Sequence, residues 1–414
     1  MLSICAIFKN EHSFILEWIA YHRCLGIHNF YIADNISSDG SSELLIALDK
    51  INILNRIGYP TESGVAPQIG AYNKLLTSAE GEWLAFIDAD EFITPQNYEE
   101  GFSELCSLLQ DKEISAVALN WAVYGSSRSI IPENQLVIER LNKRAIQDHP
   151  VNLHYKSIVR KENVLSTGKT PHEFVLSDGK NYIKTSGLPE AENNGRSKKV
   201  DWDKARINHY VIKSKSEFIT KKAARGRATT LEKELNRTLS FFRSHDLNQV
   251  EENVPRWFLN KVINEKSLII EKLKLINYEY HELKYPNPLY RTAYGMGKGN
   301  IDIINVTDKN IEIRGWAINK NNKPVNEIIA VLNSLIILKC SKILFRDRLD
   351  LARAGLELGD GLGSGFNALF PLPEEKIMTI DFYGLDNNGL VITEIKNSID
   401  ILNLINKPCN TLTN

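Results

Sequence analysis

Cysteine is scarce in this chain, and its pattern excludes two kinds of small-domain architecture. The 414 residues contain five cysteines, an odd number at wide spacings, without any Cys-x-x-Cys pair. A zinc knuckle needs closely spaced thiolate pairs, and a disulfide framework needs an even set of cysteines at short spacings. We therefore expect unpaired thiols in a reducing compartment.

Long apolar runs are also missing. No stretch approaches the roughly 20 apolar residues that a transmembrane helix requires. The first residues lack the basic start of a signal peptide, and the polar residues 9–12 interrupt the apolar run after Leu2. The sequence therefore predicts a cytoplasmic protein without a transmembrane segment, and leaves peripheral contact with the inner face of the membrane open.

Neither sign of charge is in excess. The chain has 50 Lys and Arg against 51 Asp and Glu, for a formal net charge of -1. Proteins that attract nucleic acid through their overall field are strongly basic, so we expect no nucleic-acid partner. A hydrophobic content of 43%, with no repeat or low-complexity tract, is typical of a globular chain with two or three domains.

The first ninety residues alternate apolar runs with helical periodicity. Strands are predicted within residues 2–8, 29–33, 51–57 and 83–87, and helices within 14–25, 43–48 and 66–79. This alternation predicts a mostly parallel sheet covered on both faces. Polar clusters at residues 9–11, 34–39 and 88–91 follow the carboxyl ends of three strands, where ligands bind in such sheets.

Two carboxylates stand one residue apart at the end of the fourth predicted strand. Asp88 and Asp90 are hard oxygen ligands that suit Mg²⁺ or Mn²⁺, ions that also bind diphosphates. Such a metal would neutralise a leaving nucleoside diphosphate. The alternative is a polar turn between a strand and a loop, with Asp90 capping a helix.

The rest of the chain shows two further changes of sequence pattern. Further strands are predicted at residues 114–124 and 156–160, then a helical region at 216–275 with a break near 253–255, and then a linker rich in Pro and Gly at 285–299. The short β-type runs that follow, at 301–304, 311–318, 328–332, 334–340 and 377–383, predict a small antiparallel sandwich.

The order of several segments resembles the family 2 type glycosyltransferases, and most closely the subgroup near family 92. The matching segments are residues 7–11, 16–26, 33–41, 87–92, 121–127, 172–174 and 208–218. The resemblance implies an α/β fold of three parts: a GT-A (Rossmann-like) glycosyltransferase domain at residues 1–230, a helical segment and linker at 231–298, and a β-sandwich accessory domain at 299–405. Segments 313–317, 346–350 and 365–366 are similar to a small sandwich module that accompanies bacterial glycosyltransferases and methyltransferases.

The resemblance also implies a nucleotide site. Asp34 would accept from the nucleobase, with uracil as the expected base, and Asp88 would contact the donor beside its role at the metal. The other implied nucleotide-site residues are Asn10, Glu11, Asn35 and Lys74, and Gln68 and Asn73 on the same helix as Lys74 are candidates to face the donor. The alternatives are an Asx turn for Asp34, a favourable helix-dipole charge for Glu11 and a solvated helix face for Lys74.

In similar enzymes a downstream histidine completes the metal shell, which implies His209 as a third ligand of Mn²⁺ or Mg²⁺. Lys213, Lys221 and Arg225 would then clamp the diphosphate. A structural histidine and a solvated basic face are the alternatives for these two predictions.

An inverting transfer needs a carboxylate that takes the proton of the acceptor hydroxyl. The family's sequence distance between the metal motif and the base implies the region around residues 170–180, and we predict Glu173 for this role, with Asp178 and Asp148 as alternatives. The family's usual Glu-Asp pair is missing here, which leaves both the base and the stereochemistry open. The predicted acceptor residues are Trp121, Tyr124 and His172, although aromatic residues at strand ends are often core residues.

These observations predict a metal-dependent glycosyltransferase of the hexosyl- or hexosaminyltransferase class. It would move a sugar from a UDP-sugar to a glycan or lipid-linked glycan, such as lipopolysaccharide or capsule, and a homo-oligomer is possible. One alternative is a non-catalytic carbohydrate-binding or assembly protein on the same fold. Another is a different metal-dependent nucleotide transferase, but residues 9–12 contain no glycine and no Walker-type phosphate loop is present.

Overall fold

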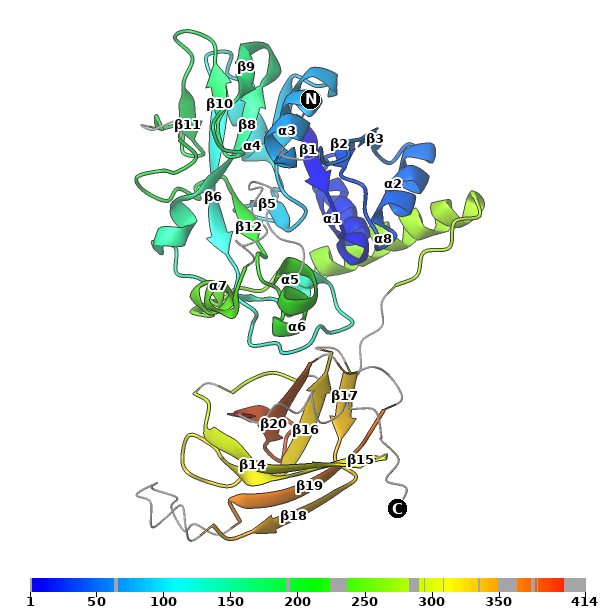
Figure 1. The fold of residues 1–414 in the computed structure, drawn as a ribbon. Helices are drawn as coiled ribbons and strands as arrows, with labels where there is room; N and C mark the ends of the chain where they lie inside the picture. Colours follow the sequence, from blue (N-terminus) through cyan, green and yellow to red (C-terminus); the bar gives the residue numbers. More distant parts are fainter. Residues whose placement is uncertain are drawn as a thin grey trace. The chain divides into compact units, whose positions relative to one another are not determined.

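The computed structural model describes residues 2–62, 66–190, 194–223, 237–282, 290–293, 295–307, 309–333, 336–348, 363–373, 377 and 379–397. The chain divides into two compact units (Figure 1). Unit 1 consists of Met1–Ser127, Gln135–Lys213 and Lys221–Leu283, and unit 2 of Arg128–Asn134, Ser214–Thr220 and Lys284–Asn414. The predicted clamp residue Arg225, residues 285–289 and 294 of the predicted linker, and residues 349–350 lie outside the described residues.

The first part of unit 1 confirms every strand and helix predicted for the first ninety residues. The elements are β1 (Leu2–Phe8), α1 (His12–Cys24), β2 (Asn29–Asp34), α2 (Ser41–Lys50), β3 (Asn55–Gly58), α3 (Pro67–Ser78) and β4 (Trp83–Phe86). Gly26 adopts a φ of 90° just after α1, a conformation in which glycine is favoured.

The second part of unit 1 is more irregular. Its elements are β5 (Glu91–Pro95), α4 (Ser103–Leu109), β6 (Ala116–Val123), α5 (Val137–Arg140), β7 (Lys143–Arg144), η1 (Pro150–Leu153), β8 (Tyr155–Arg160), η2 (Lys161–Asn163), β9 (Val164–Thr167), β10 (Phe174–Leu176), β11 (Tyr182–Lys184), β12 (Ala205–His209), α7 (Leu239–His245), β13 (Val250–Glu251) and α8 (Arg256–Leu275). Two further elements, α6 (Lys215–Glu217) and the π-helix η3 (Phe218–Ala223), lie between β12 and α7. Pro255 precedes α8, which confirms the predicted break.

The main sheet has the strand order β3-β2-β1-β4-β8-β6-β12-β5, with β11 paired to β6. Strands β1 to β4 are parallel, as predicted from their alternation with helices. Strand β8 runs antiparallel to both β4 and β6, and β5 runs antiparallel to β12. The turn at residues 87–90 therefore connects β4 to a strand in another part of the sheet.

Apolar residues on both faces explain why the parallel strands are buried. In β1, Ile4 and Phe8 pack into a core shared with α1 and α2, whereas Cys5 packs into a second core shared with α3. Helix α8 lies alongside α1 (Figure 1), where Arg23 Nε donates to Glu265 Oε1 over 2.6 Å. The predicted helical cover on both faces of the sheet is confirmed.

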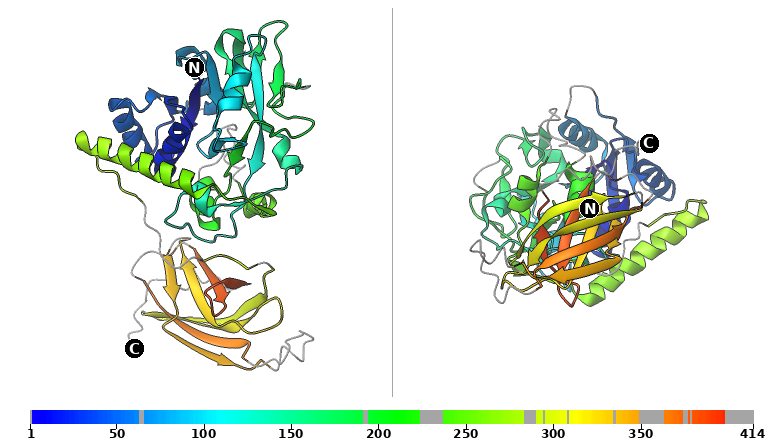
Figure 2. Two further views of the ribbon diagram at one scale, coloured as in Figure 1. Left: turned by 180° about the vertical axis from the view of Figure 1, so that it is seen from behind. Right: turned by 60° about the horizontal axis from the view of Figure 1, so that its bottom comes forward.

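Unit 2 contains the predicted sandwich of two antiparallel sheets (Figure 2). Its strands are β14 (Lys298–Val306), β15 (Asn310–Ile318), β16 (Glu327–Leu332), β17 (Ile336–Lys339), β18 (Lys342–Arg346), β19 (Gly365–Pro371), β20 (Ile380–Leu385) and β21 (Val391–Ile395). Phe366 and Phe370 from one sheet share a core with Ile328 and Phe382 from the other. None of the described helices in either unit is long and apolar enough to cross a bilayer.

Candidate active site

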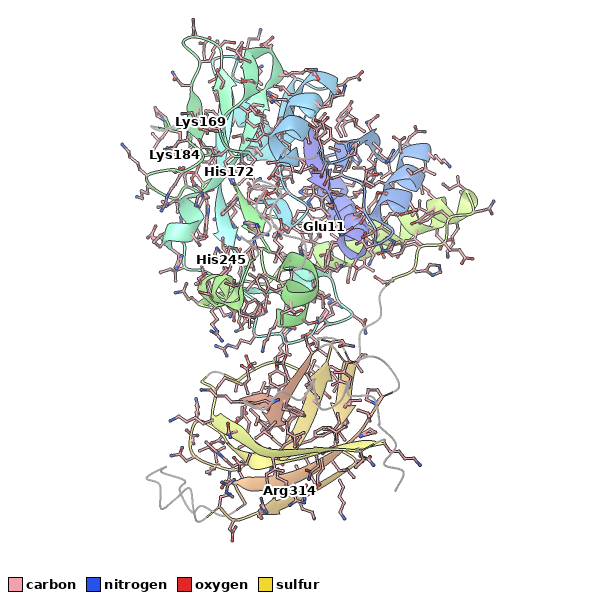
Figure 3. The ribbon with its side chains drawn as sticks, viewed as in Figure 1. Glu11, Lys169, His172, Lys184, His245 and Arg314 are labelled. Carbon is pink, nitrogen blue, oxygen red and sulfur yellow. The ribbon has the colours of Figure 1, made fainter. Side chains whose placement is uncertain are left out.

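The loops after β1 and β2 are joined at the carboxyl edge of the sheet. Asn10, with a φ of 55°, donates its backbone N–H to Ser37 Oγ over 3.0 Å and accepts at Oδ1 from the N–H of Ser38 over 2.9 Å. The N–H of Glu11 donates to Ser41 Oγ over 2.9 Å. Figure 3 shows Glu11 at the start of α1. The first two of the three predicted polar clusters therefore meet.

Asp34 is a buried residue that holds neighbouring side chains at this edge. Its side chain is 0% exposed, and Oδ1 accepts from Ser42 Oγ over 2.8 Å. Oδ2 lies 2.7 Å from the guanidinium of Arg56. The neighbouring Asn35 donates through Nδ2 to the carbonyl of Tyr59 over 2.8 Å. Both side chains thus have protein partners here, and their contacts with a nucleobase and ribose stay predictions.

The first acid of the paired carboxylates, Asp88, is held by three side chains. Its Oδ1 accepts from Gln68 Nε2 over 2.6 Å and from the hydroxyl of Tyr72 over 2.9 Å. Its Oδ2 lies 3.0 Å from Nζ of Lys156, whose side chain is 0% exposed. Gln68 is one of the residues that the sequence placed near the donor. Tyr72 and Lys156 are site residues that the sequence analysis missed.

Glu91 is the third carboxyl group of the turn, and it is fully buried. Its Oε2 accepts from the N–H of Asp88 over 2.8 Å and lies 3.4 Å from Lys156 Nζ. Burial raises the pKa of the Glu91 carboxyl to about 8, although Lys156 acts in the opposite direction. The buried ammonium of Lys156 thus faces two carboxyl groups, of which Glu91 favours the protonated form at neutral pH.

Asp90 faces a different set of partners. Nζ of Lys222, on η3, forms an ion pair with Asp90 Oδ2, and His209 Nε2 lies 3.7 Å from Asp90 Oδ1. Burial by itself would raise the pKa of Asp90, but Lys222 and His209 hold it well below its usual range. Burial lowers the pKa of His209 to about 4, so its imidazole is neutral at neutral pH.

The donor chemistry of Asp90 and His209 fits a divalent cation. His209 Nδ1 and Glu91 Oε1 are buried atoms without a hydrogen-bond partner, and they lie 3.9 Å apart. Buried polar atoms of this kind are rare in proteins. Among the described residues, no three acidic, imidazole or thiol groups already converge as a metal site. This is compatible with Mg²⁺, which commonly takes one or two carboxylates and completes its shell with substrate phosphates and water.

Two predicted clamp lysines lie around the ring of Phe14, at the beginning of α1. Nζ of Lys213 lies 4.1 Å from the centre of this ring, and Nζ of Lys221 lies 4.5 Å from it. Lys221 also donates to Ser13 Oγ over 3.1 Å. Together with Lys222, they bring three ammonium groups to this side of the site, and Lys222 was not predicted.

Three imidazole rings surround Trp121 at the end of β6. The ring centres of His209, His154 and His172 lie 4.3, 5.0 and 5.3 Å from that of the indole. His172, next to β8 in Figure 3, has its Nδ1 3.0 Å from the carbonyl of Tyr155. Burial, with a smaller effect of Lys156, lowers the pKa of His172 to about 3. Nδ1 therefore carries the proton and Nε2 is left as an acceptor.

The structure does not bring every predicted residue to this group. Tyr124 is only 2% exposed and packs against Tyr210, with ring centres 4.7 Å apart, so it is a core residue. Lys74 is exposed and lines an open hollow of about 430 Å³ with Tyr31 and Asn55, away from Asp88.

Glu173, the predicted base, bends back onto its own turn. Its Oε1 accepts from the N–H of Thr170 over 3.2 Å, and its side chain lies against Gly168. The alternatives Asp178 and Asp148 are both exposed. The role of Glu173 stays a prediction, and the adjacent His172 is the residue whose ring contacts Trp121.

Comparison with known proteins shows the family of the chain. Residues 1–256 match the model of glycosyltransferase family 92. The chain belongs to this family. The matched region contains every residue of the candidate site, including Lys156 and Lys222.

Two curated relatives in family 92 are plant proteins. One from Oryza sativa subsp. japonica is 27% identical over 186 residues, which is 44% of this chain and 31% of that protein. One from Ricinus communis is 27% identical over 229 residues, which is 50% of this chain and 34% of that protein. The chain thus matches about a third of the length of these relatives.

Solved structures show weaker likeness. S. aureus TarS is 13% identical, with a TM-score of 0.28, over 96% of this chain and 77% of TarS. Glucosyl-3-phosphoglycerate synthase from Mycobacterium tuberculosis, solved with Mn²⁺, UDP and glucosyl-3-phosphoglycerate, is 18% identical, with a TM-score of 0.26, over 40% of this chain and 58% of the synthase. Likenesses as low as these say nothing about the ligands of this chain.

Proposed function

We propose that this family 92 chain transfers a hexosyl or hexosaminyl group from a UDP-sugar to a hydroxyl of a surface glycan, such as lipopolysaccharide or capsule. We place the reaction in the cytoplasm, at the inner face of the membrane. The observation that supports it best is the turn at residues 88–91. This turn places Asp88 and Asp90, whose carboxylates have different partners, at the carboxyl edge of an α/β sheet, where ligands of such folds bind.

On the donor side, the two acids have separate tasks. Asp88 is fixed by Gln68, Tyr72 and Lys156, so its carboxylate is preorganised to orient the nucleotide. Asp90 and His209 are the residues that would hold Mn²⁺ or Mg²⁺. When bound, the metal would supply positive charge for the nucleoside diphosphate that leaves.

The lysines supply further positive charge. Lys213, Lys221 and Lys222 come from one segment of the chain, and their ammonium groups lie near Phe14 and Asp90. Charge-assisted hydrogen bonds from such groups stabilise the charge that develops on a diphosphate during bond cleavage. Arg225, the third predicted clamp, is proposed to join them.

On the acceptor side, Trp121 offers an aromatic surface on which a sugar ring can stack. His172 Nε2 is available to accept a hydrogen bond from the acceptor hydroxyl, because Nδ1 is used by the carbonyl of Tyr155. We propose an inverting transfer, in which the acceptor oxygen attacks the anomeric carbon as the bond to the diphosphate breaks. The hydroxyl proton goes to a base on this side.

The direct test is a donor screen. Purified protein is incubated with a lipopolysaccharide or capsule acceptor and with UDP-sugars or GDP-sugars, in Mn²⁺ or in EDTA, and release of the nucleoside diphosphate is measured. We expect release from one or a few UDP-sugars, dependent on metal and at least about 100-fold slower in Asp90→Asn, in line with the loss of a preorganised charged group. Asp203→Asn, which changes an exposed acid, is the matched control. Full activity of Asp90→Asn, or no release from any donor, would contradict the proposal.

A further inference from the structure

Lys222 forms an ion pair with Asp90, the carboxylate that the proposed metal would bind. Its ammonium is paired with Asp90 Oδ2, and the two side chains are only 12% and 5% exposed. An ammonium and a divalent cation cannot share this carboxylate closely without strong repulsion in a site so poorly screened by water. Metal binding at Asp90 therefore requires Lys222 to leave.

Asp88 is not free to bind the metal in place of Asp90. Its two oxygens are already engaged by Gln68, Tyr72 and the buried Lys156. The groups that remain for a metal are Asp90 Oδ1 and the imidazole of His209, whose Nδ1 has no hydrogen-bond partner. The pairing of Lys222 with Asp90 thus controls access to the metal position.

The neighbouring lysine has a different partner set. Lys221 donates to Ser13 Oγ and rests on the ring of Phe14. The two adjacent lysines carry the same charge on the same turn of η3. Lys222 instead forms an ion pair with Asp90, a proposed metal ligand.

We propose that Lys222 is an exchangeable counter-ion, which neutralises Asp90 while the donor is absent and pairs with the donor diphosphate when a divalent cation takes Asp90. This inference rests on the proposed function. The exchange makes binding of the metal and the donor mutually dependent. The metal alone has to displace an ammonium, whereas the metal with a diphosphate provides that ammonium with a new anionic partner. The site therefore disfavours metal binding until a nucleotide arrives.

The test compares Lys222→Met with Lys221→Met, which remove the same charge from adjacent residues. Binding of Mn²⁺ is measured by electron paramagnetic resonance of the free ion, with and without UDP, so that the readout does not depend on turnover. For Lys222→Met we expect the Kd for Mn²⁺ without UDP to fall by about tenfold, and the strengthening of Mn²⁺ binding by UDP to shrink by a similar factor. For Lys221→Met we expect unchanged Mn²⁺ binding without UDP and weaker binding of UDP.

Further variants distinguish unfolding of Lys222→Met, failure of the exchange and failure of the proposed function. Lys222→Arg keeps the charge and should retain weak Mn²⁺ binding without UDP, and Lys222→Gln should behave as Lys222→Met if the methionine variant unfolds. Equal Mn²⁺ affinities of wild type, Lys222→Met and Lys222→Gln without UDP, while UDP still binds with Mn²⁺, would overturn the exchange alone. Failure of the wild type to bind UDP with Mn²⁺ would overturn the proposed function and the exchange with it.

Discussion

Lys156 shows how one buried side chain sets the charge of the site. It is enclosed on β8 and faces Asp88 and Glu91 at 3.0 and 3.4 Å. Removing one member of a buried ion pair leaves an uncompensated charge, which costs more than the pair contributes. Lys156 is therefore expected to matter for both stability and donor binding.

We predict that Lys156→Met lowers the free energy of unfolding by roughly 3–5 kcal/mol, because Asp88 loses its buried counter-charge. Urea unfolding followed by circular dichroism measures this change. The double variant Lys156→Met, Asp88→Asn should recover part of the stability, since it also removes the carboxylate that lost its counter-charge. A single variant as stable as wild type would show that Lys156 is not needed as a counter-charge.

His172 and Glu173 can be distinguished by substitution because their side chains point to different places. The ring of His172 contacts Trp121, whereas the Glu173 carboxylate accepts from Thr170 within its own turn. We predict that His172→Asn lowers turnover by about 100-fold, as expected for loss of the group that accepts a hydrogen bond from the acceptor hydroxyl and positions it. Glu173→Gln should stay within about threefold of wild type, because its role in the turn tolerates an amide.

Steady-state kinetics with varied acceptor concentration measures both variants. Loss of kcat in Glu173→Gln with normal activity in His172→Asn would contradict this prediction and support Glu173 as the base. The two amide substitutions serve as controls for each other.

At the scale of single residues, the sequence revealed site groups that are neighbours along the chain. Asp88 and Asp90 were visible because they follow an apolar strand by one and three residues. Lys222 could not be predicted, because it is separated from Asp90 by 132 residues. Its direction relative to the adjacent Lys221 depends on the helical geometry of η3. Lys156 left a weak signal, namely a charged residue in an apolar predicted strand, where charges are normally paired.

At the scale of elements, α1 helps to hold the turn at residues 88–91 and the strand β5 that follows it. Trp18 Nε1 donates to the carbonyl of Glu91 over 2.7 Å. His22 bridges α1 and β5, because Nδ1 lies 2.8 Å from the carbonyl of Trp18 and Nε2 accepts from the N–H of Ile93 over 3.1 Å. The contact needs a neutral imidazole, since a protonated Nε2 cannot accept.

The α1–β5 contact predicts a pH dependence of stability. Burial lowers the pKa of His22 from 6.5 to about 3, so the unfolded chain binds more protons between these two values. The contribution of His22 to stability is therefore complete above about pH 6.5 and is lost as the pH falls towards 3, by up to about 4 kcal/mol.

The measurement is the free energy of unfolding at several pH values for wild type and His22→Phe. The phenylalanine variant should be less stable at pH 7 by about 1–3 kcal/mol, because the N–H of Ile93 loses its acceptor. Its stability should also depend less on pH between 4 and 6.5. Parallel pH profiles of the two proteins would contradict the assignment.

The elements of the first ninety residues could be predicted because each parallel strand is followed by a helix with clear periodicity. Strand β5 was missed because it directly follows the polar turn and has no turn signal of its own. The antiparallel direction of β8 could not be read either, because it depends on pairing with β4, which precedes it by about seventy residues. Strands β18 and β21 of the sandwich have only five residues each and were missed, and β19 was missed although it has seven residues and is largely apolar.

For the whole molecule, the two units are interleaved along the chain. Residues Arg128–Asn134 and Ser214–Thr220 belong to unit 2 although the chain on both sides belongs to unit 1. Within unit 2, Ile130 and Ile131 pack in one cluster with Ile329, and Arg291 pairs with Glu133 over 2.8 Å. A boundary placed at one point in the sequence cannot separate such units.

We predict that a fragment of residues 1–283 is less stable than the full chain and aggregates more readily. Ile130 and Ile131 lose their cluster, and each exposed side chain costs about 1.5–3 kcal/mol. Urea unfolding and size-exclusion chromatography measure both effects, and the variant Ile130→Ser, Ile131→Ser in the fragment should reduce aggregation. A fragment that unfolds at the same urea concentration as the full chain would contradict this prediction.

The central claim is that this family 92 chain binds a nucleotide-sugar donor through the acids at residues 88–91. Calorimetric titration with UDP, in Mn²⁺ and in EDTA and with GDP for comparison, tests it most directly. We predict that UDP binds in Mn²⁺, binds at least tenfold more weakly in EDTA and in Asp90→Asn, and binds better than GDP, as expected for a diphosphate held by a metal and lysines. The absence of UDP binding in Mn²⁺, or binding that is unaffected by EDTA and by Asp90→Asn, would contradict it.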